Sequence, residues 1–461
     1  MKNGKKLIAI LMAALLVMSV AGCGQKKSDG NVTITISGTP NETQTEKLKI
    51  HNDKVTAFQE QYPNIKIVSD SNSYSDAKVF MVTAAAQQLP TLFNSHFTDT
   101  KLRIREGYAA DITSYLEDNN ILNKINPEIL EVVMDENGKI YGVPKEGYAM
   151  GLVINKELFK KAGLVNEDGS IKYPDTYTQL AEYAQIIKEK TGVAGYAIPT
   201  TNNCGGWHFM NIAWSNGVEF MKQEKDGSWK ATFNTPEAVK SLQFIKDLKW
   251  KYNALPDNAV IDQNELLKLY GTTQAAMIFS PPSDAWSQKF GMKLENIAMA
   301  RMPKGDKERY SQTGGTAMMF SPNASEEEID ATMKWLDFNG YLLTFSEAQI
   351  AQSEKNWQMK KQENALVIPK APFSIWVDSE RIEITDGLRA KYANVDIKDF
   401  EDYLDLSNVT LKAEEPVCAQ ELYAVLDKAI QEVINNKDAD CKALIERANA
   451  DFQKNHLDKI D

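Results

Sequence analysis

The first part of the chain alternates strand-like and helix-like segments, and this pattern constrains the fold more than any other feature. Residues 32–37 alternate β-forming side chains, and residues 65–68 form a second strand-like run. Apolar residues at helical spacing lie between them over 46–62, and a further helix is predicted over 74–88. A short third strand follows at 91–93. The alternation predicts βαβ units with a mainly parallel sheet, which is an α/β fold.

The stretch 138–159 predicts a crossing between two globular halves. Residues 139–144 form a short β run, and residues 150–154 form a second apolar run. Gly147 marks the break between them, and Asn155 is placed to cap the helix that follows. Two strand-like runs around a polar aromatic joint indicate a hinge.

Length and composition indicate a globular protein with more than one domain. At 461 residues, the chain is too long for one ordinary core, and about two to three domains are expected. An apolar content of 43% and a charged content of 25% are those of globular proteins, which argues against a disordered chain. The net charge of −11 argues against a nucleic-acid partner, because phosphate backbones repel an acidic surface.

The N-terminus has the parts of a secretory signal in their usual order. A basic start precedes an apolar run over 7–20, which is shorter than the roughly 20 residues that span a bilayer. Val20-Ala-Gly-Cys23 then resembles the bacterial lipobox, in which cleavage precedes a cysteine that receives a diacylglyceryl group. We therefore predict a lipoprotein signal peptide over 1–22, lipidation of Cys23 and a flexible tether over 23–31. An ordinary signal peptide with an incidental cysteine is the alternative.

Three further cysteines leave the pairing open. They are Cys204, Cys418 and Cys441, and an odd number cannot be fully paired within one chain. A disulfide between Cys418 and Cys441 would suit an extracellular protein, and two free thiols fit the sequence equally well.

Catalytic and metal-binding motifs do not occur in the sequence. The four histidines form no HExxH pair, and neither a Walker A loop nor a calcium loop is found. The segment Ala213-Trp-Ser-Asn-Gly217 lacks the first glycine of a nucleophile elbow. We expect no catalytic residue, no metal ligand and no cofactor, and a binding protein rather than an enzyme. A glycosidase-type carboxylate pair stays open, because acidic residues are plentiful.

Several aromatic residues lie in predicted loops beside polar ones, a combination that suits sugars. Ring faces stack on C–H surfaces and polar groups pair with hydroxyls. Polar residues just after strands add to this set, because ligands of open α/β sheets collect at the carboxyl ends of strands. Each aromatic could instead fill its local core, and His96 could instead cap a helix. The ligand-binding candidates are Asn41, Glu42, His96, Asp99, Tyr148, Trp207, His208, Asp284, Trp286 and Trp376.

A series of motifs, in order, resembles the family 1 extracellular solute-binding proteins, the lipid-anchored receptors of sugar ABC importers. Each motif is weak alone, and together they cover nearly the whole mature chain. They are Val20-Ala-Gly-Cys23, Gln88-Leu-Pro-Thr-Leu-Phe93, Asn137-Gly-Lys-Ile-Tyr-Gly-Val-Pro144, Leu152-Val-Ile-Asn-Lys156, Phe159-Lys-Lys-Ala-Gly163, Pro174-Asp-Thr-Tyr177 with Leu180, Gln274-Ala-Ala-Met277, Met302-Pro-Lys-Gly305, and Gly314-Gly315 with Phe320-Ser321.

The resemblance implies a two-lobed, periplasmic-binding-protein-like α/β fold with a multi-stranded hinge. The residues from 401 onward predict, in addition, a largely helical C-terminal segment. The expected N-terminal lobe comprises 32–146 and 282–316, and the expected C-terminal lobe comprises 147–281 and 317–461. Crossings between them are expected in the stretch 138–159 and at two later places, 280–284 and 314–320.

The resemblance also implies a function. The ligand, a carbohydrate and most simply an oligosaccharide, would lie between the lobes, and closure would report it to ABC-transporter permease subunits. The receptor would be a monomer held at the extracellular face of a bacterial membrane by lipid on Cys23. By motif match the cleft would be lined by Glu42, His96, Asp99, Tyr148, Trp207, Trp286 and the glycines Gly314 and Gly315.

Two features depart from the family pattern, and two rival functions stay open. His96 differs from the commoner residue of its loop, and residues 371–416 are less familiar.

One rival keeps the fold but binds a peptide, polyamine, anion or metal chelate. Clustered basic residues in the loops would favour an anion, and the sequence shows none there. The other rival is a surface-anchored glycan-degrading enzyme.

Overall fold

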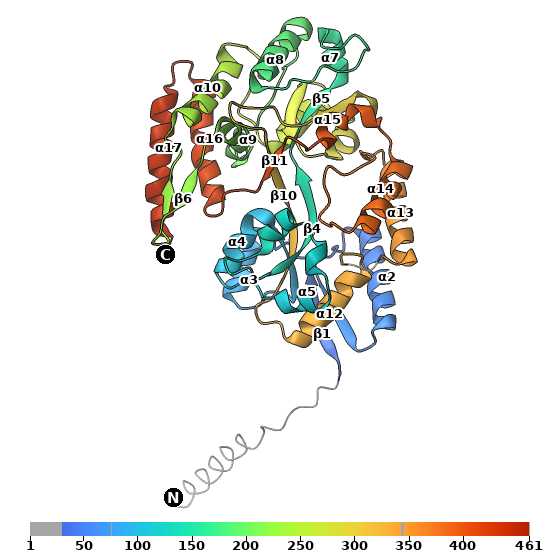
Figure 1. Ribbon diagram of the computed structural model, residues 1–461. Coiled ribbons are helices and arrows are strands. Elements are labelled where there is room, and N and C mark those ends of the chain that lie inside the picture. Colours follow the sequence, from blue (N-terminus) through green and yellow to red (C-terminus); the bar gives the residue numbers. More distant parts are fainter. Residues whose placement is uncertain (1–29, 75, 343–344, 461) are drawn as a thin grey trace, which may run out of the picture.

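Two α/β lobes are joined by long strands that run through the middle of the molecule (Figure 1). The structure is a computed structural model, and it describes residues 30–74, 76–342 and 345–460. The predicted signal peptide, Cys23 and most of the predicted tether lie outside the described residues. The prediction of a two-lobed α/β fold is confirmed.

The N-terminal lobe contains a six-stranded mixed sheet. β1 pairs in parallel with both β2 and β3, as the strand–helix alternation predicts. β10 runs antiparallel to β3 and β4, and parallel to the short β11. The strands are β1 (Val32–Ser37), β2 (Ile65–Asp70), β3 (Leu92–His96), β4 (Gly142–Ala149), β10 (Tyr310–Phe320) and β11 (Thr410–Lys412).

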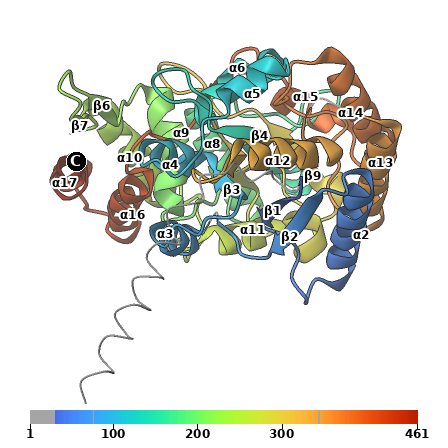
Figure 2. The same cartoon turned by 90° about the horizontal axis from the view of Figure 1, so that it is seen from below.

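Helices cover both faces of this sheet. α2 and α3 lie on opposite sides of β1 and β2 (Figure 1 and Figure 2). Ile34, Phe93, Phe320 and Trp335 meet in one buried core, which joins the first strands to residues near 335. The helices of this lobe are α2 (Thr45–Gln61), α3 (Ala77–Ala85), α4 (Phe97–Arg105), α5 (Thr113–Asp118), α6 (Pro127–Leu130) and α12 (Glu326–Phe338).

The C-terminal lobe has a small antiparallel sheet inside a larger helical shell. β5 (Gly151–Asn155) is the central strand, between β8 (Met277–Ser280) and β9 (Ile297–Ala300), and β6 (Met221–Gln223) pairs with β7 (Trp229–Ala231) in a hairpin. α16 packs against α9, α10 and α17, so the C-terminal segment is largely helical, as predicted. The helices are α7 (Lys156–Ala162), α8 (Tyr177–Thr191), α9 (Cys204–Asn216), α10 (Pro236–Trp250), α11 (Gln263–Gly271), α16 (Ala419–Asn435) and α17 (Cys441–Asn455).

The hinge consists of β4, its continuation into β5, and the antiparallel β10. Gly314 pairs with Tyr148, and the Thr313 hydroxyl donates to the Tyr148 carbonyl at 2.8 Å. Gly151 can have no side chain, because a Cβ there would lie 2.6 Å from the ring of Tyr403. Where β5 ends, the Asn155 side chain accepts from the N–H of Leu158, which confirms the predicted cap of α7.

Two segments pack differently from the expected lobe boundaries. The segment 282–309 lies with the C-terminal lobe, because β9 pairs with β5 and Trp286 is buried beside Tyr270. The segment 317–338 lies in the N-terminal core through Phe320 and Trp335. The crossing expected at 280–284 is therefore wrong. After β8 the chain turns directly into a short helix, Ala285–Lys289, whose tryptophan fills the core of the same lobe.

A helix pair, α13 (Glu347–Gln362) and α14 (Ser379–Tyr392), connects the two lobes beside the hinge (Figure 1). On the N-terminal lobe, Asp378 pairs with Lys124 at 3.3 Å. On the C-terminal lobe, Lys360 pairs with Asp284 at 3.4 Å. Of this pair, only α14 falls within the less familiar segment 371–416, and it accounts for part of that segment.

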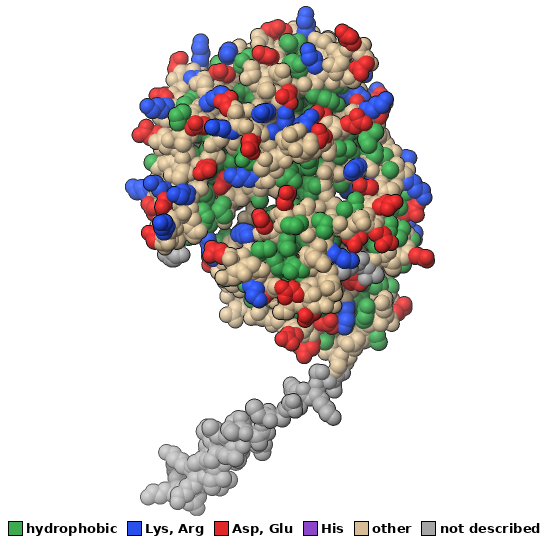
Figure 3. Space-filling model, viewed as in Figure 1, with side chains coloured by type: hydrophobic (Ala, Val, Ile, Leu, Met, Phe, Trp, Pro, Cys, Tyr) green, Lys and Arg blue, Asp and Glu red, His purple; other side chains and the backbone are tan. Residues whose placement is uncertain are grey.

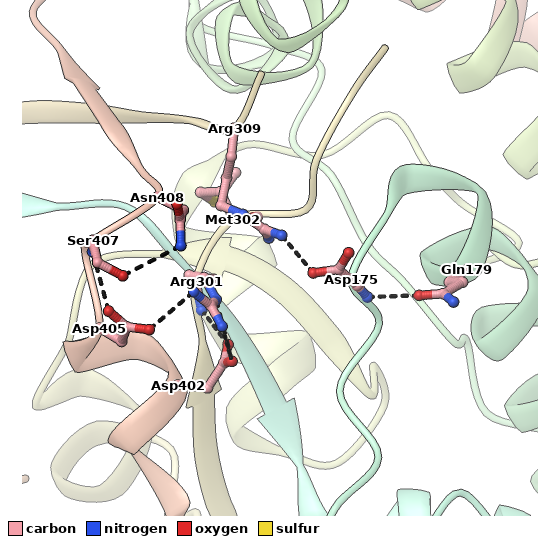
Figure 4. A network of polar contacts seen from close by, with 9 residues as sticks. All are labelled: Asp175, Gln179, Arg301, Met302, Arg309, Asp402, Asp405, Ser407 and Asn408. Carbon is pink, nitrogen blue, oxygen red and sulfur yellow. Dashed lines mark hydrogen bonds and ion pairs between the residues drawn. The ribbon is translucent and has the colours of Figure 1, made fainter. Parts of the chain in front are cut away.

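Ion pairs fasten the chain after α14 to the C-terminal lobe (Figure 4). Arg301, which directly follows β9, pairs with Asp402 of α15 (Glu401–Leu404) at 3.1 Å and with Asp405 at 3.1 Å. Arg309 at the start of β10 pairs with Asp175. These contacts fix the approach of residues 409–416 to the cleft, where β11 pairs with β10.

Within the described part of the chain, no helix combines the length and apolarity needed to cross a membrane. Cys204, Cys418 and Cys441 are free thiols, so the second of the two pairing alternatives holds.

Candidate functional site

A cavity of about 570 Å³ lies between the two lobes, above the hinge strands. The space-filling view shows the surface hollowed along this boundary (Figure 3). Its N-terminal wall comes from the end of β3 and the start of α4, its floor from β4 and β10, and its C-terminal wall from α9, α16 and the chain before α16. The lining residues are His96, Phe97, Thr98, Glu146, Gly147, Tyr148, Asn202, Asn203, Cys204, Trp207, Gly314, Gly315, Thr316, Glu414, Gln420 and Tyr423.

The floor of the cleft depends on two glycines of β10. A Cβ on Gly314 would lie 2.3 Å from the Tyr148 hydroxyl oxygen, so only glycine lets that ring lie across the strand. A Cβ on Gly315 would lie 2.2 Å from the Glu146 carbonyl and 2.7 Å from the Phe97 ring. The Gly-Gly pair thus lets the Tyr148 ring and the Glu146 backbone lie against β10 at the base of the cavity.

The C-terminal wall is organised around one carboxyl group, that of Glu414. It accepts a hydrogen bond from the Trp207 indole N–H at 2.9 Å and another from the Tyr423 hydroxyl at 2.8 Å. Burial raises the pKa of Glu414 to about 7, although both hydrogen bonds favour the charged form. Burial also raises the pKa of Tyr148, and the charge of Glu414 raises it further, which places Tyr148 close to this group.

A side chain from another helix caps the N-terminus of α9 at the same wall. Asn203 lies at the N-cap with φ of 66°, and its own side chain makes no cap bond. Asp427 of α16 accepts instead from the N–H of Asn203 at 2.8 Å and from that of Gly206 at 2.7 Å. Gly206 lets the two helices approach, since a Cβ there would lie 2.4 Å from the Tyr423 backbone. Trp207 is therefore held by α16 as much as by its own helix.

The N-terminal wall is shorter and more polar. β3 continues to His96 and α4 begins directly at Phe97, so the third strand is longer than the run predicted over 91–93. His96 is exposed, lines the cleft, and makes no side-chain cap bond to α4. Asp99 does not line the cavity and pairs with Arg103 at 3.4 Å. Burial is the main cause of the raised pKa of Glu414, and the charge of Asp99 is a lesser one.

Five of the predicted ligand residues meet in this cleft. They come from four separate parts of the chain, β3, β4, α9 and β10, and their contact with a ligand stays a prediction. They are His96, Tyr148, Trp207, Gly314 and Gly315.

Three predicted ligand residues are core residues instead, and the prediction is corrected for them. Trp286 is fully buried beside Tyr270, and Trp376 is buried in the N-terminal core with the Arg381 guanidinium 4.7 Å from its ring centroid. His208 is fully buried with its Nε2 3.1 Å from Gln263, and burial lowers the pKa of this imidazole to about 3.

The remaining predicted residues lie at the surface away from the cavity. Asn41 and Glu42 are exposed in the loop before α2, where Asn41 accepts from the N–H of Thr43 at 3.0 Å. Asp284 pairs with Lys360 of α13. None of the three lines the cleft.

Sequence reasoning missed Glu414 and Tyr423. Both lie in the C-terminal segment, 207 residues beyond Trp207 in the case of Glu414. No local motif marks either residue, and the only sequence signal is the acidic run before α16. Among the residues that the structure describes, no group of three or more histidines, cysteines and carboxylates is placed to hold a metal ion.

Comparison with known proteins places this geometry in a family. Over 348 residues, or 72% of this chain and 76% of the other, the chain is 24% identical to the maltodextrin-binding protein MdxE of Bacillus subtilis. It is 23% identical to a binding protein of Brucella abortus and spans about three fifths of its length, 59%. Maltose-bound MalE3 of T. maritima has a similar fold, with a TM-score of 0.64 at 18% identity, over 92% of this chain and 99% of that one.

The family model described as bacterial extracellular solute-binding protein matches residues 39–338. This match begins after β1 and includes β2 and β3 of the first lobe, both hinge strands and the small sheet of the second lobe. The chain therefore belongs to the bacterial extracellular solute-binding protein family.

Proposed function

We propose that this protein is an extracellular receptor that binds a carbohydrate in the cleft between its lobes. The observation that carries the proposal is the cluster of Trp207, Glu414 and Tyr423 opposite Tyr148. An aromatic face can stack on the C–H face of a sugar while neighbouring polar groups pair with its hydroxyls. A volume of about 570 Å³ also falls within the usual range of small-molecule sites.

The names of the similar proteins support a sugar as the ligand. The relative from Bacillus subtilis is named for maltodextrin, and similar solved structures carry maltose and, in Listeria monocytogenes, cycloalternan. We extend this to an oligosaccharide here, delivered to the permease of an ABC transporter by a monomer anchored through lipid on Cys23. In this proposal closure of the lobes brings both walls onto the ligand.

Substitution of Trp207 tests the site directly. Trp207→Ala removes both the stacking face and the indole donor to Glu414, so we expect Kd for the bound sugar to rise roughly thirtyfold, about 2 kcal/mol. Isothermal titration against a panel of malto-, gluco- and galacto-oligosaccharides measures this. Trp250→Ala is the matched control, because Trp250 is exposed on α10, outside the cleft.

Two outcomes would overturn the proposal. If no sugar of the panel binds or raises the melting temperature of the parent protein, the ligand belongs to another class. If oligosaccharide incubated with the protein is cleaved, the protein is a glycan-degrading enzyme and not a receptor alone. We expect the protein to bind the oligosaccharide without cleaving it, so mass spectrometry of the recovered sugar should show only the intact molecule.

A further inference from the structure

A second cavity, of about 290 Å³, lies within the N-terminal lobe. It is enclosed by α2, the ends of β1 and β3, the end of α12 and one residue of β4. It shares no lining residue with the interlobe cleft. Lys145 and Glu146 are neighbours on β4, yet Lys145 lines the inner cavity and Glu146 lines the cleft.

The ionisable residues around this cavity all carry basic side chains. Lys47, His51 and Lys54 lie on α2 at spacings of four and three, so they share one face of the helix. Lys145 joins them from β4. No aspartate or glutamate belongs to the lining, although the chain as a whole has a net charge of −11. The tertiary structure thus gathers a basic cluster that is scattered in the sequence.

The lysines of this cluster have no anionic partner among the described residues. Lys145 lies 5.8 Å from the ring centroid of Tyr341, a cation–π contact. Burial lowers the pKa of Lys54, and no carboxylate raises it again. The charge of Lys54, together with burial, also lowers the pKa of His51. The cavity is therefore a region of uncompensated positive charge.

A buried hydroxyl group also lacks a partner here. Ser37 is 7% exposed, and its Oγ makes no hydrogen bond to any described residue. Buried polar groups are nearly always hydrogen-bonded, so this unpaired hydroxyl is unusual, but its oxygen is closed off from the cavity. Asn94 also lines the cavity, and its amide nitrogen would lie 2.9 Å from a Cβ on Gly38. Gly38 thereby keeps this amide donor open to the cavity.

Solvent alone accounts for the unpaired charge of Lys47, which is exposed, but not for that of Lys54, which is partly buried. Ammonium and amide donors that line one small space from several elements match the several acceptor oxygens of a tetrahedral anion. We propose that this cavity binds a small tetrahedral oxyanion, phosphate or sulfate, independently of the sugar cleft.

Titration of inorganic phosphate and of sulfate into the purified protein tests this, with ionic strength held constant by chloride. Lys54→Met removes an ammonium group from the cavity lining, whereas Ser37→Ala removes a hydroxyl that does not open onto the cavity. We expect phosphate affinity to fall about tenfold in Lys54→Met and to stay unchanged in Ser37→Ala, because only the ammonium group can reach the anion. The ratio of phosphate to sulfate affinity distinguishes the two ions.

Lys49→Met is the matched control, because Lys49 lies on another face of α2 and pairs with Asp53 at 3.6 Å. Trp207→Ala separates the two sites, since it should weaken sugar binding and leave phosphate binding unchanged. The proposal is overturned if phosphate gives the same heat of binding as chloride, or if Lys49→Met loses as much phosphate affinity as Lys54→Met. Competition between phosphate and sugar for binding would also overturn it. Melting curves of Ser37→Ala confirm folding, because removing an unpaired hydroxyl should not lower stability.

Discussion

Among single residues, Glu414 has the most informative environment. Its carboxyl joins a tryptophan and a tyrosine at the cleft wall, yet burial raises its pKa from the ordinary 4.5 to about 7. A carboxyl with a raised pKa binds its proton more tightly in the folded state than in the unfolded state. Its contribution to stability is therefore complete below about pH 4.5 and is lost as the pH rises through 7.

Glu414→Gln should remove this pH dependence. At pH 8 the free energy of unfolding of the variant should be roughly 1–3 kcal/mol higher than that of the parent protein, because the variant has no buried charge. This difference in the free energy of unfolding should shrink toward pH 4.5. Urea unfolding at several pH values measures it. Glu446→Gln, at an exposed position of α17, is the control and should leave the profile unchanged. Parallel profiles for Glu414→Gln and the parent would contradict the raised pKa.

Among elements, α9 shows how the cleft wall is held. Its N-cap residue supplies no side-chain bond, and Asp427 of α16 satisfies the free N–H groups across the helix interface. This long-range cap orients the first turn of α9, which carries Trp207. The stability of the wall and its affinity for ligand are therefore linked through one side chain.

Asp427→Ala should lower both stability and ligand affinity. We expect a loss of roughly 2 kcal/mol in the free energy of unfolding, because two backbone N–H groups lose their acceptor. Asp440→Ala removes the local cap of α17, which accepts from Lys442 and Ala443, and should cost about 1 kcal/mol without changing ligand affinity. Denaturant unfolding and sugar titration of both variants separate the two effects. Equal affinities in the two variants would show that α9 is held by other contacts.

For the whole molecule, the lobes are connected by the hinge strands and by the α13–α14 pair. The floor of the cleft lies on the hinge strands, at Tyr148 and Gly314, so relative rotation of the lobes there changes the width of the cleft. The helix pair contacts both lobes through Asp378 and Lys360. Closure therefore has to bend or shift this pair as well as the strands.

Small-angle X-ray scattering should show this motion. We expect a saturating sugar to reduce the radius of gyration of the parent protein, because closure brings the two walls together. Trp207→Ala should need roughly thirtyfold more sugar to reach the same reduced radius, as its higher Kd requires. An unchanged radius with the sugar demonstrably bound would mean that the cleft binds ligand without closing.

Local signals in the sequence predict much of the fold. The strand over 32–37 and the Asn155 cap of α7 appear as expected. Each depends on residues within a few positions of one another, through alternation, capping or turn chemistry. The hinge stretch was recognisable for the same reason, because strand runs, a glycine and a cap follow one another directly.

The lobe boundaries and half of the candidate site depend on contacts between distant residues. Whether Trp207 or Trp286 faces the cleft is decided by what packs against each ring. Glu414 meets Trp207, and Tyr270 covers Trp286. The basic cavity and the Asp427 cap arise in the same way. The sequence alone determined the elements and the family, because their signals are local. Only the tertiary structure decided which side chains share a cavity, because that follows from packing between segments hundreds of residues apart.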